Sequence, residues 1–236
     1  MKAAVIATRL QALGDPARAQ VLQRFFKTGP GEYAHGDVFL GLYVPEIRAL
    51  AKEYQALALS EIEALLRAEM HEARLLALLV MVRAYRRGDE NQRKRIYRLY
   101  LGNTRHINNW DLVDLSAPHI VGAHLAYRDR APLSALAQSG LLWDRRIAIL
   151  ATFHYIKAHE YGETLRIAER LLTDPHDLIH KAVGWMLREI GKRDRATEED
   201  FLKKYYKTMP RTMLRYAIER FPQELRQDYL RGVIAR

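Results

Sequence analysis

Apolar residues recur at spacings of three and four along nearly the whole chain, and almost no segment alternates apolar and polar positions. This spacing places apolar side chains on one face of an α-helix, whereas a half-buried strand needs a period of two. The pattern therefore predicts an all-α protein built from amphipathic helices.

Residues that favour helix starts stand in front of many of these segments. Asp15-Pro16 combines an N-cap residue with a proline in the first turn, and Ser60 and Glu63 have the spacing of a capping box. Residues 28–43, which contain four glycines, predict an irregular connection between two helices. Further prolines stand where new helices can begin, at Pro45, Pro118, Pro132, Pro175, Pro210 and Pro222.

A weak internal repeat places one basic residue near the start of four apolar segments. Arg146, Lys181 and Arg215 follow one another at spacings of 35 and 34, and Arg74 precedes Arg146 by 72, which is twice 36. Trp110 lies midway between Arg74 and Arg146, in the same register. A period in the thirties made of helix pairs is typical of α-solenoids of the HEAT or TPR kind, which stack into curved arrays. We therefore expect one domain over residues 1–236, a curved α-solenoid of HEAT-like repeats.

The row of basic residues predicts a concave basic cleft that binds DNA. Basic side chains near helix N-termini suit phosphates, because the unpaired N–H groups and the helix dipole add to the side-chain charge. The alternative is that these residues form ion pairs with acids in neighbouring repeats, as many surface charges do.

The composition narrows the class of protein. The chain has 236 residues and a net charge of +10, which favours a polyanionic partner such as DNA or RNA. It has no cysteine, so disulfides, cysteine-ligated metals and a cysteine nucleophile are excluded. The apolar stretch Leu75 to Val82 is far shorter than a membrane span, and the apolar run at the N-terminus is too short for a signal peptide. We expect a cytoplasmic protein that does not enter a membrane.

One set of residues in this register predicts chemistry. Trp110 and Asp114 are four apart and share one helix face, and the repeat places Arg146 and Trp185 on the same surface. One carboxylate, one arginine and two indoles suit cleavage of a glycosidic bond, whose transition state resembles an oxocarbenium ion. A second acid is dispensable when the leaving base is already cationic, as N-alkylated purines are. Three alternatives stay open: Trp110 packs in the core, Asp114 pairs with an arginine, or Asp111 caps the helix.

A metal site is not expected. His176 and His180 have the four-residue spacing of helical metal ligands, but the sequence offers them no third ligand. The sequence also contains no signature of a bound cofactor.

Five strings resemble the AlkD family of bacterial DNA glycosylases, over about residues 20–230. They are VFLGLYVPEIRALAKEY (38–54), NNWDLVDLSAPHIVG (108–122), LWDRRIAILATF (142–153), DLIHKAVGWMLREIGKRD (177–194) and PRTMLRYAIERFP (210–222). The resemblance implies HEAT-like repeats and excision of alkylated purines from duplex DNA.

Carried over residue by residue, the resemblance assigns the catalytic carboxylate to Asp114. It assigns the two tryptophans that face the lesion to Trp110 and Trp185, and the arginine that clamps a phosphate to Arg146. Tyr33 corresponds to an aromatic residue that touches the DNA backbone. Together with the repeat, these matches give a DNA-binding set of Arg146, Lys181, Arg74, Arg215 and Tyr33.

The resemblance implies a monofunctional glycosylase for 3-methyladenine and 7-methylguanine. Such an enzyme hydrolyses the N-glycosidic bond of purines made cationic by alkylation at N3 or N7, and it leaves an abasic site without using a deep base-flipping pocket. We expect a monomer in the bacterial cytosol and nucleoid. The alternative is a non-catalytic HEAT-repeat protein that binds damaged or branched DNA.

Overall fold

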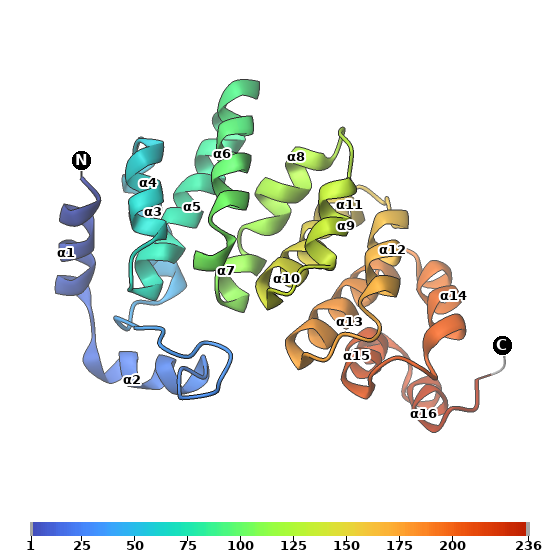
Figure 1. Ribbon diagram of the computed structural model, residues 1–236. Coiled ribbons are helices and arrows are strands. Elements are labelled where there is room, and N and C mark those ends of the chain that lie inside the picture. The colour runs from blue at the N-terminus through green and yellow to red at the C-terminus, as the bar shows by residue number, and fades with distance from the viewer. Residues whose placement is uncertain (1, 235–236) are drawn as a thin grey trace. The chain divides into compact units, whose positions relative to one another are not determined.

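The computed structural model describes residues 2–234, and these residues are helical or irregular (Figure 1). Within them the one strand-like pairing is an isolated bridge between Val38 and Met70. The prediction of an all-α protein is therefore confirmed.

The chain divides into two compact units, Met1–Ile120 and Val121–Arg236. A π-helical segment, η2 (Pro118–Gly122), runs across the point of division. The other elements of the first unit are α1 (Ala3–Leu13), α2 (Pro16–Phe25), α3 (Val44–Glu53), α4 (Leu59–Leu66), α5 (His71–Arg87), α6 (Glu90–Gly102), η1 (Thr104–His106) and α7 (Trp110–Asp114). Those of the second unit are α8 (Ala123–Leu125), α9 (Ala131–Ala137), α10 (Leu142–Ala151), α11 (Phe153–Lys157), α12 (Gly162–Arg170), α13 (Asp177–Gly191), α14 (Arg195–Tyr205), α15 (Arg211–Ala217), η3 (Ile218–Arg220) and α16 (Gln223–Arg231).

Most of the predicted helix starts are confirmed. The Asp15 carboxylate caps α2 by accepting hydrogen bonds from the N–H groups of Ala17 and Arg18. Each of the six further prolines lies within a helical segment's first two residues or one or two residues before it. The predicted capping box at Ser60 and Glu63 is wrong, because α4 begins at Leu59 and no side chain caps it. Glu63 instead pairs with Arg67 one turn later.

The first unit is built around α5. Every residue from His71 to Val82 is buried, so this helix has no solvent face over three turns, as in helices that other elements surround. Helices α3, α4 and α6 pack against it, and Figure 1 shows them beside it. The stretch Leu75 to Val82, which is apolar throughout, is thus explained by burial in a protein core.

A buried carboxylate on α5 fixes the connection between α2 and α3. Glu72 is 1% exposed, and its carboxylate accepts hydrogen bonds from the backbone N–H groups of Leu40, Gly41 and Leu42. Gly41 has a φ of +90°, and a Cβ there would lie 2.2 Å from the carbonyl oxygen of Asp15. The irregular connection predicted at residues 28–43 is confirmed, and backbone hydrogen bonds to one side chain hold its end in place.

The second unit is built around α13, which packs against α10, α12, α14 and α15. Helices α13 and α15 approach each other closely at Gly184, where a Cβ would lie 2.4 Å from the carbonyl oxygen of Met213. The absence of a side chain at this position therefore sets the distance between the two helices.

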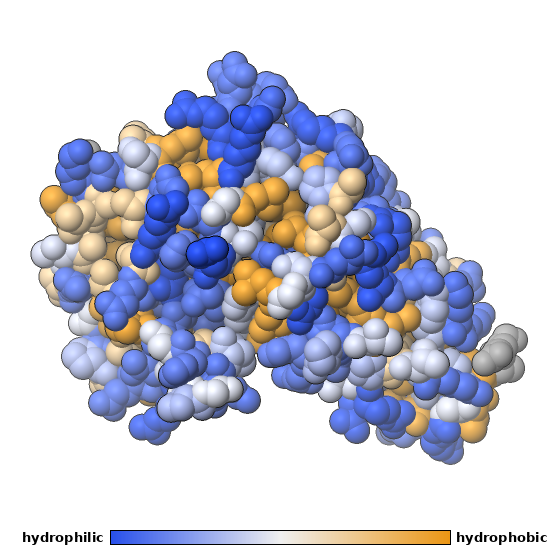
Figure 2. Space-filling model, in the orientation of Figure 1, coloured by the Kyte–Doolittle hydropathy of each residue, from blue (hydrophilic) through white to orange (hydrophobic). Residues whose placement is uncertain are grey.

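Within residues 2–234, no helix combines the length and the apolar character that crossing a bilayer requires. Hydrophilic residues cover most of the face drawn in Figure 2, with smaller hydrophobic areas between them.

Replacing Gly184 with alanine should force α15 away from α13, because the added methyl group meets backbone rather than a flexible side chain. We expect the free energy of unfolding to fall by about 1–3 kcal/mol, the usual cost of overpacking a core. Urea denaturation would measure it.

Gly102→Ala is the matched control. It lies in α6, and nothing lies within 4 Å of an added Cβ there. Its stability should stay the same or rise slightly, because alanine favours a helix more than glycine does. Equal losses from both variants would contradict the close approach at Gly184.

Candidate functional site

The short helix α7 carries Trp110 as its first residue and Asp114 as its last. Both side chains are half-buried, so each keeps some surface in contact with solvent. The cap is Asn109, whose side-chain oxygen accepts a 2.8 Å hydrogen bond from the Trp110 N–H. Asn109 rather than Asp111 is therefore the N-cap, although the Asp111 carboxylate also accepts a 2.9 Å hydrogen bond from the Leu112 N–H in the first turn. The helix has five residues, so contacts with the rest of the unit must hold it in place.

A buried ionic network supplies those contacts. The His71 imidazole bridges two carboxylates, with its Nδ1 3.0 Å from Asp37 and its Nε2 2.9 Å from Asp111 on α7. The Arg74 guanidinium also donates to Asp37, and the Asn109 side-chain amide donates to Asp37 at 3.3 Å. The network joins the α2–α3 connection, α5 and the start of α7.

The charges in this network shift two pKa values. Burial alone would lower the pKa of His71, but the charge of Asp111 and the hydrogen bonds to Asp111 and Asp37 outweigh burial and raise this pKa to about 9. Burial alone would raise the pKa of Asp37, because it disfavours the charged carboxylate. The hydrogen bond with His71 and the charge of Arg74 outweigh burial and lower this pKa. At neutral pH the imidazole is therefore protonated and donates from both ring nitrogens.

Arg74, which the sequence analysis placed among the DNA contacts, lies inside this network. It is 5% exposed, and its Nη1 donates to the carbonyl oxygens of Ala68 at 2.9 Å and Glu69 at 2.7 Å. Its ion pair with Asp37 agrees with the alternative in which the basic residues of the repeat pair with acids instead of binding phosphates. Burial leaves Arg74 almost no surface on which to meet a phosphate.

A cluster of aromatic rings supports Trp110. The ring of Phe26 is nearly parallel to those of Trp110 and Phe39, with centroids 5.1 Å and 4.8 Å away and interplanar angles of 19°. The His71 imidazole contacts both phenylalanine rings, with centroids 4.3 Å from Phe39 and 5.3 Å from Phe26. The exposed ring of Phe25 meets Trp110 edge-on at 6.0 Å. Trp110 is thus neither fully buried nor loose, since one face is held by Phe26.

Asp37, His71, Phe26 and Phe39 were not among the predicted site residues. They come from three separate segments, and only Phe39 falls within one of the family-like strings, residues 38–54. The one available signal was the pair Phe25-Phe26 directly before an irregular connection, which does not reveal a contact with Trp110.

In the second unit, the basic residues of the repeat occupy equivalent places. Arg146, Lys181 and Arg215 are each the fifth residue of their helices, α10, α13 and α15. Their surroundings differ. Arg146 is 5% exposed and donates from Nη1 to the carbonyl oxygen of Leu178 at 2.7 Å, which ties α10 to the first turn of α13. Lys181 pairs with Asp177 at 2.7 Å and is half-buried, and Arg215 is exposed.

Trp185 lies one turn after Lys181 on α13 and is half-buried. Its indole N–H donates to the Glu189 carboxylate at 3.2 Å, and its ring lies 5.9 Å from that of Phe153. Burial tends to raise the pKa of Glu189, but hydrogen bonds from Lys192, Arg193 and Trp185 lower it. A charged, hydrogen-bonded carboxylate therefore fixes the orientation of this indole.

Of the remaining predicted residues, Tyr33 is half-buried in the α2–α3 connection. His176 caps α13 by accepting from the Leu178 N–H at 3.1 Å, and His180 bonds the Asp174 carbonyl at 2.5 Å. Among the described residues, no group of three or more histidines and acids is arranged to hold a metal ion.

The charge of His71 makes the stability of the first unit depend on pH. Its pKa is about 9 in the folded protein and near 6.5 when unfolded, so its contribution is complete below about pH 6.5 and is lost as the pH rises through 9. The difference corresponds to a stabilisation on the order of 3 kcal/mol. Melting temperatures between pH 6 and 10 should fall more steeply for the wild type than for His71→Gln.

His35→Gln provides the control, because His35 is an exposed histidine of the same unit. Its melting temperature should follow the wild-type pH dependence. Parallel curves for the wild type and His71→Gln would show that the buried imidazole is uncharged.

Comparisons with known proteins indicate the fold and the family of this chain. A solved structure, described as a predicted DNA alkylation repair enzyme from Enterococcus faecalis, superposes with a TM-score of 0.69 at 20% identity. The match covers 89% of this chain and 97% of that one, and at this identity it shows the fold alone. No curated protein matches the chain. The family model described as DNA alkylation repair enzyme matches residues 6–221, so this chain belongs to the DNA alkylation repair enzyme family.

Proposed function

We propose that this protein is a monofunctional DNA glycosylase that hydrolyses the N-glycosidic bond of cationic alkylated purines in duplex DNA. The observation that carries the proposal is α7, a five-residue helix that presents a half-buried indole and a half-buried carboxylate one turn apart. A scaffold does not need such a helix to be held by a buried ion network and a cluster of aromatic rings. The match of residues 6–221 to a DNA repair family supplies the substrate class.

In this proposal Asp114 is the catalytic carboxylate. Its charge stabilises the oxocarbenium-like deoxyribose as the bond to the base breaks, and it orients the attacking water. The indole of Trp110 adds a cation–π contribution, because its ring can face the developing positive charge. Phe26 and the Asp111–His71 contact hold this helix in the required orientation before substrate arrives.

The second unit contributes DNA binding and a second indole. Lys181 and Arg215 can reach solvent and anchor backbone phosphates, and Trp185 packs against the nucleotide with its ring oriented by Glu189. Tyr33 adds a contact with the DNA backbone. Arg146 presents little area to a phosphate, and its bond to Leu178 favours a role in positioning α13.

We further propose that the helices form HEAT-like repeats with a basic DNA-binding cleft and act as one domain. The shared fifth position of Arg146, Lys181 and Arg215 supports this, together with their spacings of 35 and 34. The net charge of +10 suits a polyanionic substrate.

Asp114→Asn tests the proposal directly. With a duplex carrying one 7-methylguanine, the wild type should leave an abasic site that alkali cleaves. Asp114→Asn should release the base at least about 100-fold more slowly, since the amide lacks the charge that stabilises the sugar cation. Affinity for DNA should be unchanged or slightly higher.

Asp200→Asn makes the same chemical change on α14, where the side chain is 79% exposed, and should retain full activity. Base release by the wild type and Asp114→Asn at equal rates would remove Asp114 from the chemistry. DNA binding without release by the wild type would instead support a non-catalytic DNA-binding repeat protein.

The charge of the leaving base is expected to decide which damaged bases the enzyme releases. Asp111 is the other carboxylate of α7, but it is 6% exposed and bound to His71, so it cannot protonate a leaving base. A duplex with 7-methylguanine should therefore lose its cationic base, whereas one with neutral 8-oxoguanine should not. Comparable release of both bases would indicate an acid catalyst and contradict this mechanism.

A further inference from the structure

A pocket in the first unit gathers positive charge without any acid. It has a volume of about 180 Å³ and lies between α3, α5 and the residues that follow α7. Its polar lining consists of Arg48 from α3, Arg83 and Arg86 from α5, and His119 from η2. The remaining lining residues are apolar, and Leu115 among them directly follows Asp114 in the chain.

The three arginines of this pocket lack counter-charges. Among residues 2–234, none of Arg48, Arg83 and Arg86 forms an ion pair with a carboxylate. Arg86 contacts the ring nitrogen Nδ1 of His119 at 3.2 Å, and the Nε of Arg83 is buried without a hydrogen-bond partner. Elsewhere in the same unit, by contrast, Arg9 pairs with Glu53 and Arg67 with Glu63.

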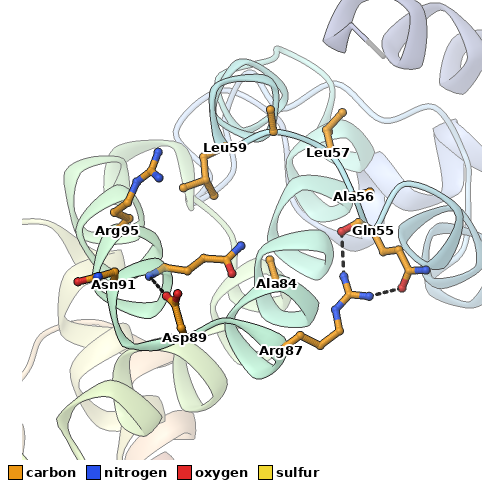
Figure 3. Close-up of a pocket in the computed structure, with 11 residues that line it drawn as sticks. Gln55, Ala56, Leu57, Leu59, Ala84, Arg87, Asp89, Asn91 and Arg95 are labelled. Carbon is orange, nitrogen blue, oxygen red and sulfur yellow. Dashed lines mark hydrogen bonds between the residues drawn. The ribbon is translucent and has the colours of Figure 1, made fainter.

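A larger pocket in the same unit provides a comparison, because its lining carries charges of both signs (Figure 3). It has a volume of about 520 Å³ and is lined by Arg87 and Arg95 but also by the acid Asp89. Arg87 is already bonded to the side chain and the backbone carbonyl of Gln55, at 2.5 Å and 2.9 Å. Its charges are mixed and partly satisfied, so it has no preference for an anion.

Arg48 and Arg86 are exposed and Arg83 is half-buried, so their guanidinium groups repel one another only weakly through solvent, and an anion held between them replaces this repulsion with attraction. A buried donor without a partner adds a cost to this weak repulsion. Both costs are removed by a ligand with several acceptor oxygens and negative charge. Guanidinium groups bind phosphate oxygens with matched geometry, often through two parallel hydrogen bonds.

We propose that this pocket, lined by Arg48, Arg83, Arg86 and His119, binds a backbone phosphate of duplex DNA. The identity of the polyanion rests on the proposed function, while the preference for a phosphate rests on the lining residues. Because Leu115 joins the pocket wall to Asp114, a phosphate held here fixes the DNA strand next to the catalytic helix. The pocket is therefore a positioning site for the reaction as well as a source of affinity.

Binding of a fluorescein-labelled undamaged duplex, followed by anisotropy, tests the site. Arg83→Gln and Arg86→Gln should each weaken binding about tenfold near 100 mM salt, as removal of a charge-assisted hydrogen bond does. Between about 50 and 200 mM salt, the slope of log K against log salt should become shallower by about 0.9 for each phosphate that the variant no longer neutralises. Melting temperatures measured in parallel should show that both variants stay folded.

Arg95→Gln is the matched control, since it removes the same charge from the same unit but lines the larger pocket. Its affinity and salt slope should stay close to the wild-type values. An equal loss of affinity in all three variants would mean that overall charge matters and would overturn the pocket. Unchanged binding by Arg83→Gln and Arg86→Gln would overturn it as well.

Base release separates this proposal from the proposed function. If the pocket variants bind DNA weakly but the wild type releases no base from 7-methylguanine DNA, the phosphate site stands and the glycosylase fails. If the wild type releases the base and both pocket variants bind DNA normally, the proposed phosphate site is wrong and the proposed glycosylase activity stands. If both proposals hold, Arg86→Gln should raise KM at least about fivefold and change kcat less, because it weakens binding rather than bond cleavage.

Discussion

A protonated imidazole held between two buried carboxylates connects the segments on which the candidate site depends. His71 bonds Asp37 at one ring nitrogen and Asp111 at the other, and Asp37 also bonds Arg74. Burying these charges separately would be costly, but together they are paired and hydrogen-bonded. The result is a fixed link from α5 to both the α2–α3 connection and α7. A five-residue helix could not hold an indole and a carboxylate in place by its own hydrogen bonds.

The aromatic cluster extends this link to Trp110. His71, Phe39 and Phe26 contact one another, and Phe26 stacks on Trp110, so the half-buried indole is supported by rings that also contact the buried ion network. Glu72, the neighbour of His71, holds residues 40–42 of the α2–α3 connection through their backbone N–H groups. Two adjacent side chains of α5 therefore fix both the α2–α3 connection and α7, which explains why the start of α5 is polar and yet buried.

Positive charge in this protein is used in three different ways. Arg74 and Arg146 lie inside, where they orient neighbouring backbone and acids. Several surface arginines, such as Arg9 and Arg67, are paired with carboxylates, and such exposed ion pairs contribute little to stability. Within residues 2–234, Arg48, Arg83 and Arg86 of the pocket form no ion pair with a carboxylate, which suits contact with an external anion. A count of basic residues does not distinguish these roles, because each depends on what lies within hydrogen-bond reach.

The sequence by itself determined the helical class, most helix starts and membership of the DNA alkylation repair enzyme family. These features are local: the period of apolar residues, prolines at first turns and long strings such as NNWDLVD are each read within a few turns of chain. The register of Arg146, Lys181 and Arg215 was also available, because repeats preserve position within a helix. The register could not determine burial. Arg74 and Arg215 hold equivalent places in the repeat, yet Arg74 is buried and Arg215 is exposed. Only the tertiary structure decided that, along with the His71 network, the support of Trp110 by Phe26 and the arginine pocket, since each joins residues from separate segments through contacts that no local pattern records.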